Sequence, residues 1–184
     1  MTDEIVDTNV VLVANGQHQG VSRASVATCA VRLQAIMNGK RLVIDDRYRI
    51  LGEYQNKTKP NTGNRAGDEF VKWVLRNTRI TERVHRVELT AHPQRGFVTF
   101  PDDKELAKFD EPDRKFVAVA CAHGDFPPIL QATDSKWLGW NDALLRHGVM
   151  VEFICRDDIE RFQAQKAKAA PAPAGARRTG EKNN

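Results

Sequence analysis

Apolar and polar positions divide this chain of 184 residues into two kinds of segment. Short runs of aliphatic and β-branched residues predict strands at residues 4–7, 41–45, 84–89, 129–133 and 149–154. Longer segments with helical spacing lie between them. Strands that alternate with helices are typical of a parallel sheet with helices on both faces. We therefore expect an α/β protein, with a three-layer α/β/α fold and a mostly parallel sheet of about five strands.

Two helices are predicted in the first third of the chain. One begins after Ser22, a good capping residue, and ends at the pair Asn38-Gly39. Its apolar residues recur on one face, at Val26, Ala30, Leu33 and Met37. Asp45 or Asp46 is expected to cap the second helix. Ile50 and Tyr54 share one face of that helix with Glu53 at its border, and Lys59-Pro60 ends it.

The rest of the chain is less regular. Residues 56–67 are polar and predict a surface loop before an amphipathic helix that contains Phe70, Trp73, Val74 and Leu75. Residues 97–100 suit a short strand or a turn, and a helix is expected to begin at residues 101–103 and to contain Leu106. A late helix carries Trp137, Trp140 and Leu144, for which core packing is the favoured role. A final helix is expected from Asp157 to about Lys168.

The net charge of +4 and the isoelectric point near 9.1 come from the end of the chain. Residues 161–184 carry six basic residues and one acidic residue, a net +5, so residues 1–160 carry a net −1. We therefore divide the chain into one folded domain, residues 1–160, and a basic tail rich in Ala and Pro, residues 161–184. This tail lacks large apolar residues beyond its start, and we expect it to be disordered.

Composition and motifs exclude several classes of protein. No apolar run approaches the roughly 20 residues that span a bilayer, so we expect no membrane association and a cytoplasmic location. Cys29, Cys121 and Cys155 are too widely spaced for a zinc knuckle and are expected to be buried free thiols. The five histidines lack metal-ligand spacing. No phosphate-binding glycine loop and no nucleophile elbow is present.

Acidic residues stand where predicted strands meet helices. Asp7 and Asp134 follow strands, Glu53 lies early in a helix after a strand, and Asp113 precedes an apolar helical run. Parallel sheets bind ligands beyond the carboxyl ends of their strands, so these four side chains are expected to converge. Carboxylates brought together repel each other unless a cation balances them. Oxygen ligands suit Mg²⁺ or Mn²⁺, ions that promote phosphodiester hydrolysis.

These residues resemble the motifs of the PIN-domain nucleases, which include the toxin ribonucleases of bacterial toxin and antitoxin pairs. The resemblance covers roughly residues 5–154. Asp7-Thr8-Asn9 is similar to the opening motif of the family, and residues 50–54 are similar to the segment that bears its glutamate. Asp113 with Ala118 and Ala120 resembles the third acidic motif, and Thr133-Asp134 resembles the fourth. The segment between Glu53 and Asp113 is longer than in the compact toxins.

The resemblance implies that Asp7, Glu53, Asp113 and Asp134 bind Mg²⁺ or Mn²⁺ and that a water molecule attacks the phosphodiester. It implies that Asn9 and Thr133 orient these ligands and that RNA is the substrate. An inhibitory protein partner of the antitoxin kind and a homodimer are further expectations of the toxin-like assignment. Asp110 and Glu111 compete with Asp113 for the third position.

Several alternatives remain open in the sequence. Asp7 and Asp134 also suit helix capping, and Glu53 alone suits a solvated helix face. Lys57, Lys59 and Lys136 flank the expected site, where they either meet substrate phosphates or are simply solvated. A noncatalytic PIN-like module that binds RNA or a partner is one alternative function. A DNA-directed nuclease of the flap type is another. A phosphatase of the haloacid dehalogenase type is disfavoured because it needs a second aspartate where Asn9 stands.

Overall fold

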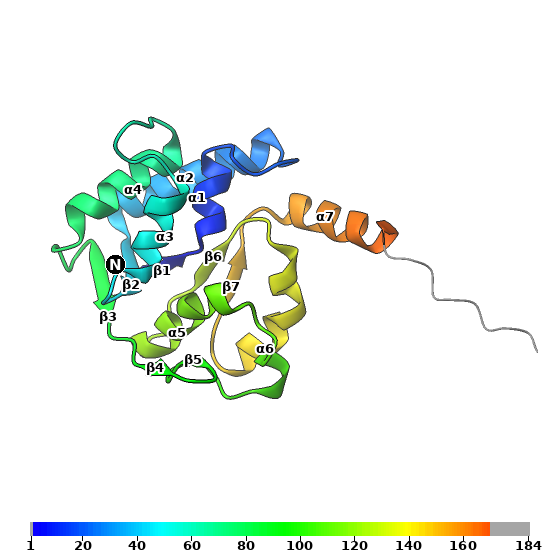
Figure 1. Ribbon diagram of the computed structural model, residues 1–184. Helices are drawn as coiled ribbons and strands as arrows, with labels where there is room; N and C mark the ends of the chain where they lie inside the picture. Colours follow the sequence, from blue (N-terminus) through cyan, green and yellow to red (C-terminus); the bar gives the residue numbers. More distant parts are fainter. Residues whose placement is uncertain (1, 170–184) are drawn as a thin grey trace, which may run out of the picture.

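The computed structural model describes residues 2–169 (Figure 1). Five strands form one sheet in the order β3-β2-β1-β6-β7, and every neighbouring pair is parallel. Each of them overlaps a predicted strand. Their bounds are β1 Asp3–Val6, β2 Arg41–Asp45, β3 Val84–Val87, β6 Ile129–Gln131 and β7 Val151–Phe153.

Helices cover both faces of the sheet, which confirms the three-layer α/β/α fold (Figure 1). On one side α1 (Thr8–Ala14), α2 (Arg23–Gly39), α3 (Arg49–Lys57) and α4 (Ala66–Asn77) pack against each other. On the other side lie α5 (Arg114–His123) and α6 (Asn141–Arg146), and α5 contacts four of the strands. The central strand β1 therefore lies between two helical layers, and its carboxyl end points to an edge that several helices border.

The predicted caps position the first long helices. Ser22 Oγ accepts a hydrogen bond from the Ser25 amide at 3.1 Å at the start of α2. The buried Asp45 carboxylate accepts bonds from the amides of Arg49 and Ile50, both at 2.9 Å. Each bond satisfies an amide that has no partner within its helix. The expected cap of α2 is confirmed. Helix α3 begins after Tyr48, its N-cap residue, and Asp45 caps it with its side chain only, from three residues before.

The core follows the apolar positions of the strands and helices. Ile5 and Val6 of β1, Leu33 of α2 and Phe116 of α5 are fully buried. Trp137 is also fully buried, which confirms the expectation that it packs in the core. Cys29 and Cys155 are buried free thiols, as expected, whereas Cys121 is only partly buried.

Five details differ from the sequence-based expectation. Helix α1, directly after Asp7, was not predicted. Residues Gly96–Phe97 (β5) pair with Ala91–His92 (β4) in a small antiparallel hairpin, and Phe100 lies outside it. The helix expected after residue 101 is only one turn, η1 (Lys104–Leu106). The late helix is split into η3 (Ser135–Trp140) and α6, and a further turn, η2 (Glu111–Asp113), precedes α5.

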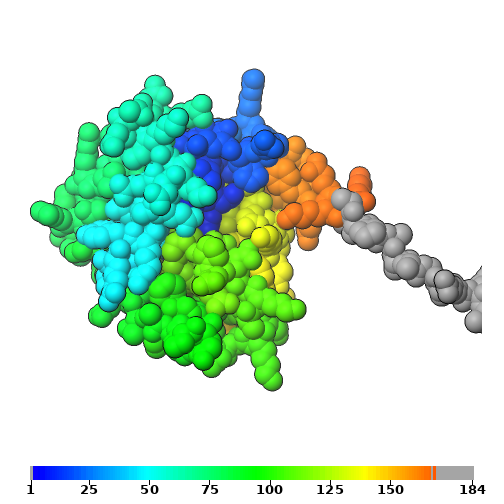
Figure 2. Space-filling view, viewed as in Figure 1, coloured from blue at the N-terminus to red at the C-terminus, as the bar shows by residue number. Residues whose placement is uncertain are grey.

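The end of the domain also differs from the expected boundary. Helix α7 spans Arg156–Ala169, close to the predicted final helix, so the boundary at residue 160 falls inside a helix. Figure 2 shows α7, in orange, against the blue N-terminal segment and the yellow segment that contains η3 and α6. The tail from residue 170 onward, expected to be disordered, lies outside the described residues. Between residues 2 and 169 no helix is both long and apolar enough to cross a membrane.

Candidate active site

Asp7 stands at the carboxyl end of the central strand. It is the N-cap of α1, and its Oδ1 accepts a hydrogen bond from the Asn9 amide at 2.7 Å. Its own amide donates to the carbonyl of Leu130 in β6 at 3.0 Å. Only 4% of the residue is exposed. Asp7 therefore caps a helix, which was one of the alternatives open in the sequence, and this cap holds its carboxylate in a buried position.

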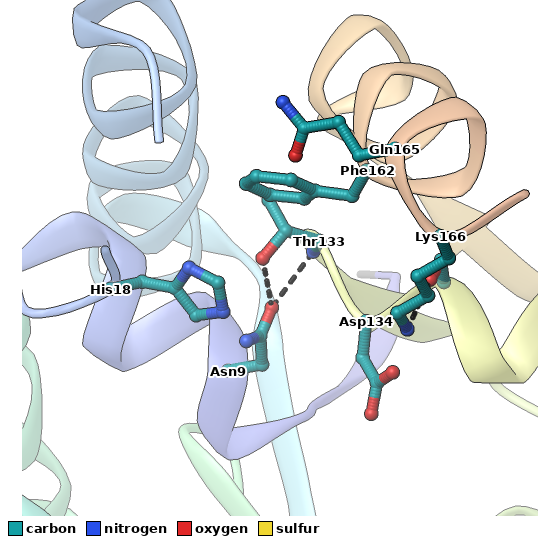
Figure 3. A pocket seen from close by; sticks show the side chains of 8 residues that line it. Asn9, His18, Thr133, Asp134, Phe162, Gln165 and Lys166 are labelled. Atoms are coloured by element: carbon teal, nitrogen blue, oxygen red, sulfur yellow. Dashed lines mark hydrogen bonds between the residues drawn. The ribbon is translucent and has the colours of Figure 1, made fainter. Parts of the chain in front are cut away.

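Asn9 joins the ends of β1 and β6. Its Oδ1 accepts two hydrogen bonds from Thr133, one from the amide at 2.8 Å and one from Oγ1 at 3.0 Å (Figure 3). The next residue, Asp134, is the N-cap of η3 and accepts from the Lys136 amide at 3.0 Å. Asn9 and Thr133 thus fix the spacing between the segments that carry Asp7 and Asp134.

Charge interactions link Asp7 to Asp113 and Glu53, and they link Asp113 to Glu53 and Asp134. Burial raises the pKa of Asp7 well above its ordinary value, and the charges of Asp113 and Glu53 raise it further. Burial also raises the pKa of Asp113 to about 6, with further contributions from Asp134 and Glu53. Proximity of like charges and loss of solvation both disfavour ionised carboxylates. We name Asp7, Glu53, Asp113 and Asp134 the carboxylate cluster.

A lysine that was not predicted as functional lies among these acids. Lys115, on the first turn of α5, is 7% exposed, and its Nζ is 2.5 Å from Oε2 of Glu53. The same ammonium group donates to the Pro112 carbonyl. Its charge lowers the pKa of both Asp7 and Asp113 and partly offsets their mutual repulsion. The only signal in the sequence was a cation at the start of an apolar helical run.

The donor atoms of the cluster fit a hard divalent cation, since all four side chains offer carboxylate oxygens. As they stand, however, no three His, Cys, Asp or Glu side chains within residues 2–169 are arranged to hold a metal ion. One reason is the ion pair between Lys115 and Glu53, which holds the Glu53 carboxylate on the lysine. The Glu53 side chain is 27% exposed, so it has room to turn away from Lys115. The cluster fits Mg²⁺ or Mn²⁺ in chemistry and needs a side-chain rearrangement to bind it.

The competing candidates for the third acidic position lie differently. Asp110 Oδ2 pairs with Lys136 Nζ at 2.8 Å, and Glu111 is exposed. Asp113 is the acidic residue of this segment whose charge is prominent in raising the pKa of Asp7. Asp113 is therefore the acidic residue of this segment that interacts with Asp7.

The three predicted substrate-binding lysines divide into two groups. Lys136 lies at the border of the cluster, where its amide donates to Asp134 Oδ1 at 3.0 Å. The charges of Asp110, Asp134 and Asp113 raise its pKa. Lys57 and Lys59 are exposed, at the end of α3 and just after it. Of the three, Lys136 is the lysine that the structure places next to a predicted carboxylate.

A pocket of about 570 Å³ adjoins the cluster. Its lining includes Asn9, Thr133 and Asp134 from the strand ends and residues of α7. His18, Phe162, Gln165 and Lys166 complete its walls with Ser135 (Figure 3). The sequence did not predict His18 or the α7 residues as part of a site, because most of α7 was assigned to the tail and His18 to the surface.

Comparison of the chain with protein-family models, curated proteins and solved structures found no match.

Proposed function

We propose that the protein is a Mg²⁺- or Mn²⁺-dependent endoribonuclease of the PIN type. The observation that carries the proposal is the carboxylate cluster at the carboxyl end of β1, centred on the buried Asp7. A fold that buries this aspartate beside Asp113 and Glu53 raises the pKa of two acids and loses stability when they ionise. A divalent cation bound by these carboxylates would offset their repulsion and stabilise the ionised cluster.

In this proposal Asp7, Glu53, Asp113 and Asp134 hold the cation. Bound there, Mg²⁺ or Mn²⁺ would supply a Lewis acid for the phosphodiester and a means to activate water. The chain itself supplies orientation. Asn9 and Thr133 keep the two aspartate-bearing segments at fixed spacing, and Lys136 offers a cation to the approaching phosphate. Toxin activity, an antitoxin-like partner and a homodimer remain parts of the proposal that only the family resemblance supports.

Lys115 favours one alternative, a noncatalytic module that binds RNA or a protein partner. An ammonium group that already pairs with Glu53 balances part of the charge without metal. Such a module binds RNA equally well in the presence of a chelator. The endoribonuclease proposal instead requires that cleavage stops when the metal is removed.

A panel of labelled substrates tests the proposal against these alternatives. Single-stranded RNA, DNA of the same sequence and a DNA flap junction are incubated with Mg²⁺, Mn²⁺ or EDTA. We expect metal-dependent cleavage inside the RNA strand. Cleavage of the flap with intact RNA would replace the proposal with a DNA-directed nuclease, and chelator-resistant binding without any cleavage would favour the noncatalytic module.

A further inference from the structure

The pocket between α7 and the strand ends combines aromatic and polar walls. Its volume of about 570 Å³ falls within the range of roughly 300–1,000 Å³ that is usual for small-molecule sites. We call it the α7 pocket. Because Asn9, Thr133 and Asp134 line it, a ligand in this pocket lies next to the carboxylate cluster (Figure 3).

Two aromatic rings face one side of the α7 pocket. The ring centroids of His18 and Phe162 are 5.8 Å apart, and the rings are tilted by 41°. Both side chains are half-buried, so part of each ring remains open to the pocket. Exposed aromatic faces that are held in place are the surfaces on which proteins stack nucleobases.

The polar groups of the α7 pocket suit the rest of a nucleotide. Gln165 offers both hydrogen-bond donors and an acceptor, which match the edge of a base. Lys166 Nζ donates to Ser135 Oγ at 2.8 Å, which holds this ammonium group beside Asp134 (Figure 3). A phosphate between the base and the carboxylate cluster would meet that charge.

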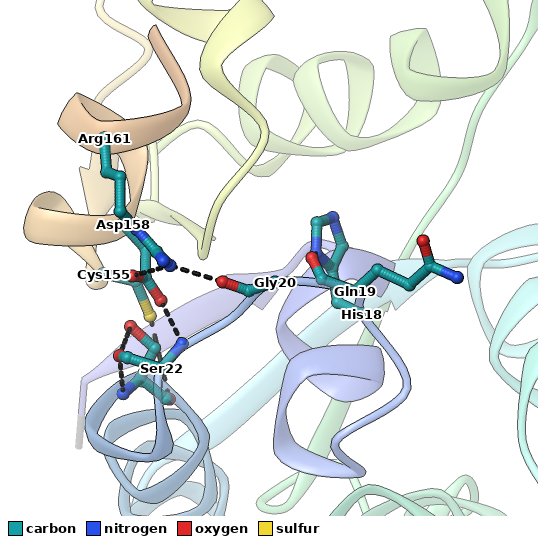
Figure 4. Close-up of polar contacts among 8 residues, drawn as sticks. His18, Gln19, Gly20, Ser22, Cys155, Asp158 and Arg161 are labelled. Carbon is teal, nitrogen blue, oxygen red and sulfur yellow. Dashed lines mark hydrogen bonds and ion pairs between the residues drawn. The ribbon is translucent and has the colours of Figure 1, made fainter. Parts of the chain in front are cut away.

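Polar contacts fix α7 to the loop that carries His18 (Figure 4). The carboxylate of Asp158, a residue only 3% exposed, accepts from the Ser22 amide at 2.8 Å. Arg161 donates to Asp158 at 2.6 Å and also to the carbonyl of Gly20. These hydrogen bonds therefore fix the position of α7 relative to the loop, so both form one wall of the pocket.

Gly20 lies beside Phe162 in the loop that carries His18. Its φ of +74° lies in the left-handed region, where other residues are strained. A Cβ atom at this position would lie 3.4 Å from the Phe162 ring, which is an ordinary van der Waals contact. The backbone conformation of the loop, rather than lack of space beside the ring, therefore favours glycine here.

We propose that the α7 pocket binds one nucleobase of single-stranded RNA beside the phosphodiester held at the carboxylate cluster. The base lies against Phe162 and His18, Gln165 contacts its edge, and Lys166 faces the adjoining phosphate. The inference deepens the proposed ribonuclease function and rests on it for the identity of the strand. It adds a subsite that α7 supplies.

The test separates stacking from packing at Phe162. Phe162→Leu keeps apolar volume beside Gly20 but removes the aromatic face, and Phe162→Trp restores such a face. Phe126→Leu is the matched control, because Phe126 is a solvent-accessible phenylalanine that precedes β6, whereas the cluster lies beyond the other end of that strand. Circular dichroism verifies that each variant keeps its helices. Fluorescence anisotropy with a labelled single-stranded RNA gives Kd in EDTA, and cleavage with Mn²⁺ gives KM and kcat.

We expect Phe162→Leu to raise Kd about tenfold, the scale of one lost base-stacking contact, and to raise KM in the same direction. Phe162→Trp and Phe126→Leu should bind like the unmodified protein. Lys166→Gln should also weaken binding, whereas Lys168→Gln, at an exposed position of the same helix, should not.

Failure of this inference differs from failure of the proposed function. RNA binding that Phe162→Leu weakens, without cleavage under any metal condition, supports the subsite and removes only the nuclease. Metal-dependent cleavage with the same Kd and KM in Phe162→Leu overturns the subsite and leaves the nuclease. A protein that neither binds nor cleaves RNA overturns both.

Discussion

The ammonium group of Lys115 lies 2.5 Å from the carboxylate of Glu53, inside a group of acids that includes the buried Asp7. The cation and the acids come from different elements, since Glu53 belongs to α3 and Lys115 to α5. The pair is shielded on the lysine side, where 8% of the side chain is exposed, and open on the glutamate side, where 27% is exposed. In the proposed function, Lys115 therefore competes with the divalent cation for Glu53.

Replacement of Lys115 by Met should strengthen metal binding. Methionine keeps most of the buried aliphatic volume and removes the charge that opposes a divalent cation and engages Glu53. We expect Kd for Mn²⁺ to fall roughly tenfold, measured by isothermal titration calorimetry at pH 8. Lys72→Met, which breaks a comparable exposed pair with Glu69, is the control and should leave Kd unchanged. An unchanged or weaker affinity in Lys115→Met would show that the lysine does not compete with the metal.

Asp113 should make the stability of the metal-free protein depend on pH. Its pKa in the folded protein is about 6, above the ordinary value of 3.8, so the folded state holds this proton more tightly than the unfolded state does. The corresponding stability is fully present below pH 3.8 and is lost as the pH rises through about 6. Urea unfolding in EDTA should show this loss between pH 4 and pH 7, relative to Asp113→Asn, as a difference on the order of 1 kcal/mol. Parallel curves for the two proteins would contradict the prediction.

Asp7→Asn should stabilise the metal-free protein at pH 7. Asparagine keeps an oxygen that accepts from the Asn9 amide but carries no charge in a buried site beside Asp113. We expect the free energy of unfolding to rise by about 1–2 kcal/mol. Mg²⁺ should stabilise the unmodified protein and not the variant. Asp157→Asn, at an exposed position of α7, controls for the change in net charge. A variant less stable than the unmodified protein in EDTA would contradict the prediction that repulsion between the carboxylates destabilises the metal-free protein.

Asn9→Ala should loosen the site without removing a carboxylate. The substitution leaves the amide of Thr133, a buried residue, without its acceptor, which costs about 1–3 kcal/mol. We expect a lower urea midpoint and a lower kcat with little change in metal affinity. Asn61→Ala, in an exposed loop, should change neither quantity. A normal kcat in a destabilised Asn9→Ala protein would show that this bridge supports the fold alone.

The sheet was predictable because most strands are short apolar runs that end in turn residues or acids, although β3 has His and Arg between its two valines. Helix α1 was missed for a physical reason. Its residues from Val10 to Val13 are all aliphatic, three of them β-branched, so no polar face reveals a helical period. Position after β1 and burial between α2 and α4 decide its conformation.

The site was partly visible in the sequence. Asp7 and Asp134 follow strands, and parallel topology alone brings such residues together. Lys115 was not visible as a partner of Glu53, because that pairing depends on how α5 packs beside α3. The contact of His18 with Phe162 joins residues far apart in the chain through a loop and a helix whose relation no local pattern encodes.

The most direct test of the central claim is the initial rate of cleavage of labelled single-stranded RNA as Mn²⁺ is increased. The unmodified protein is compared with Asp7→Asn and with Asp157→Asn. We expect a saturable, EDTA-sensitive rate that Asp157→Asn retains and that folded Asp7→Asn loses. Equal rates in Asp7→Asn and the unmodified protein, or cleavage that persists in EDTA, would contradict this expectation.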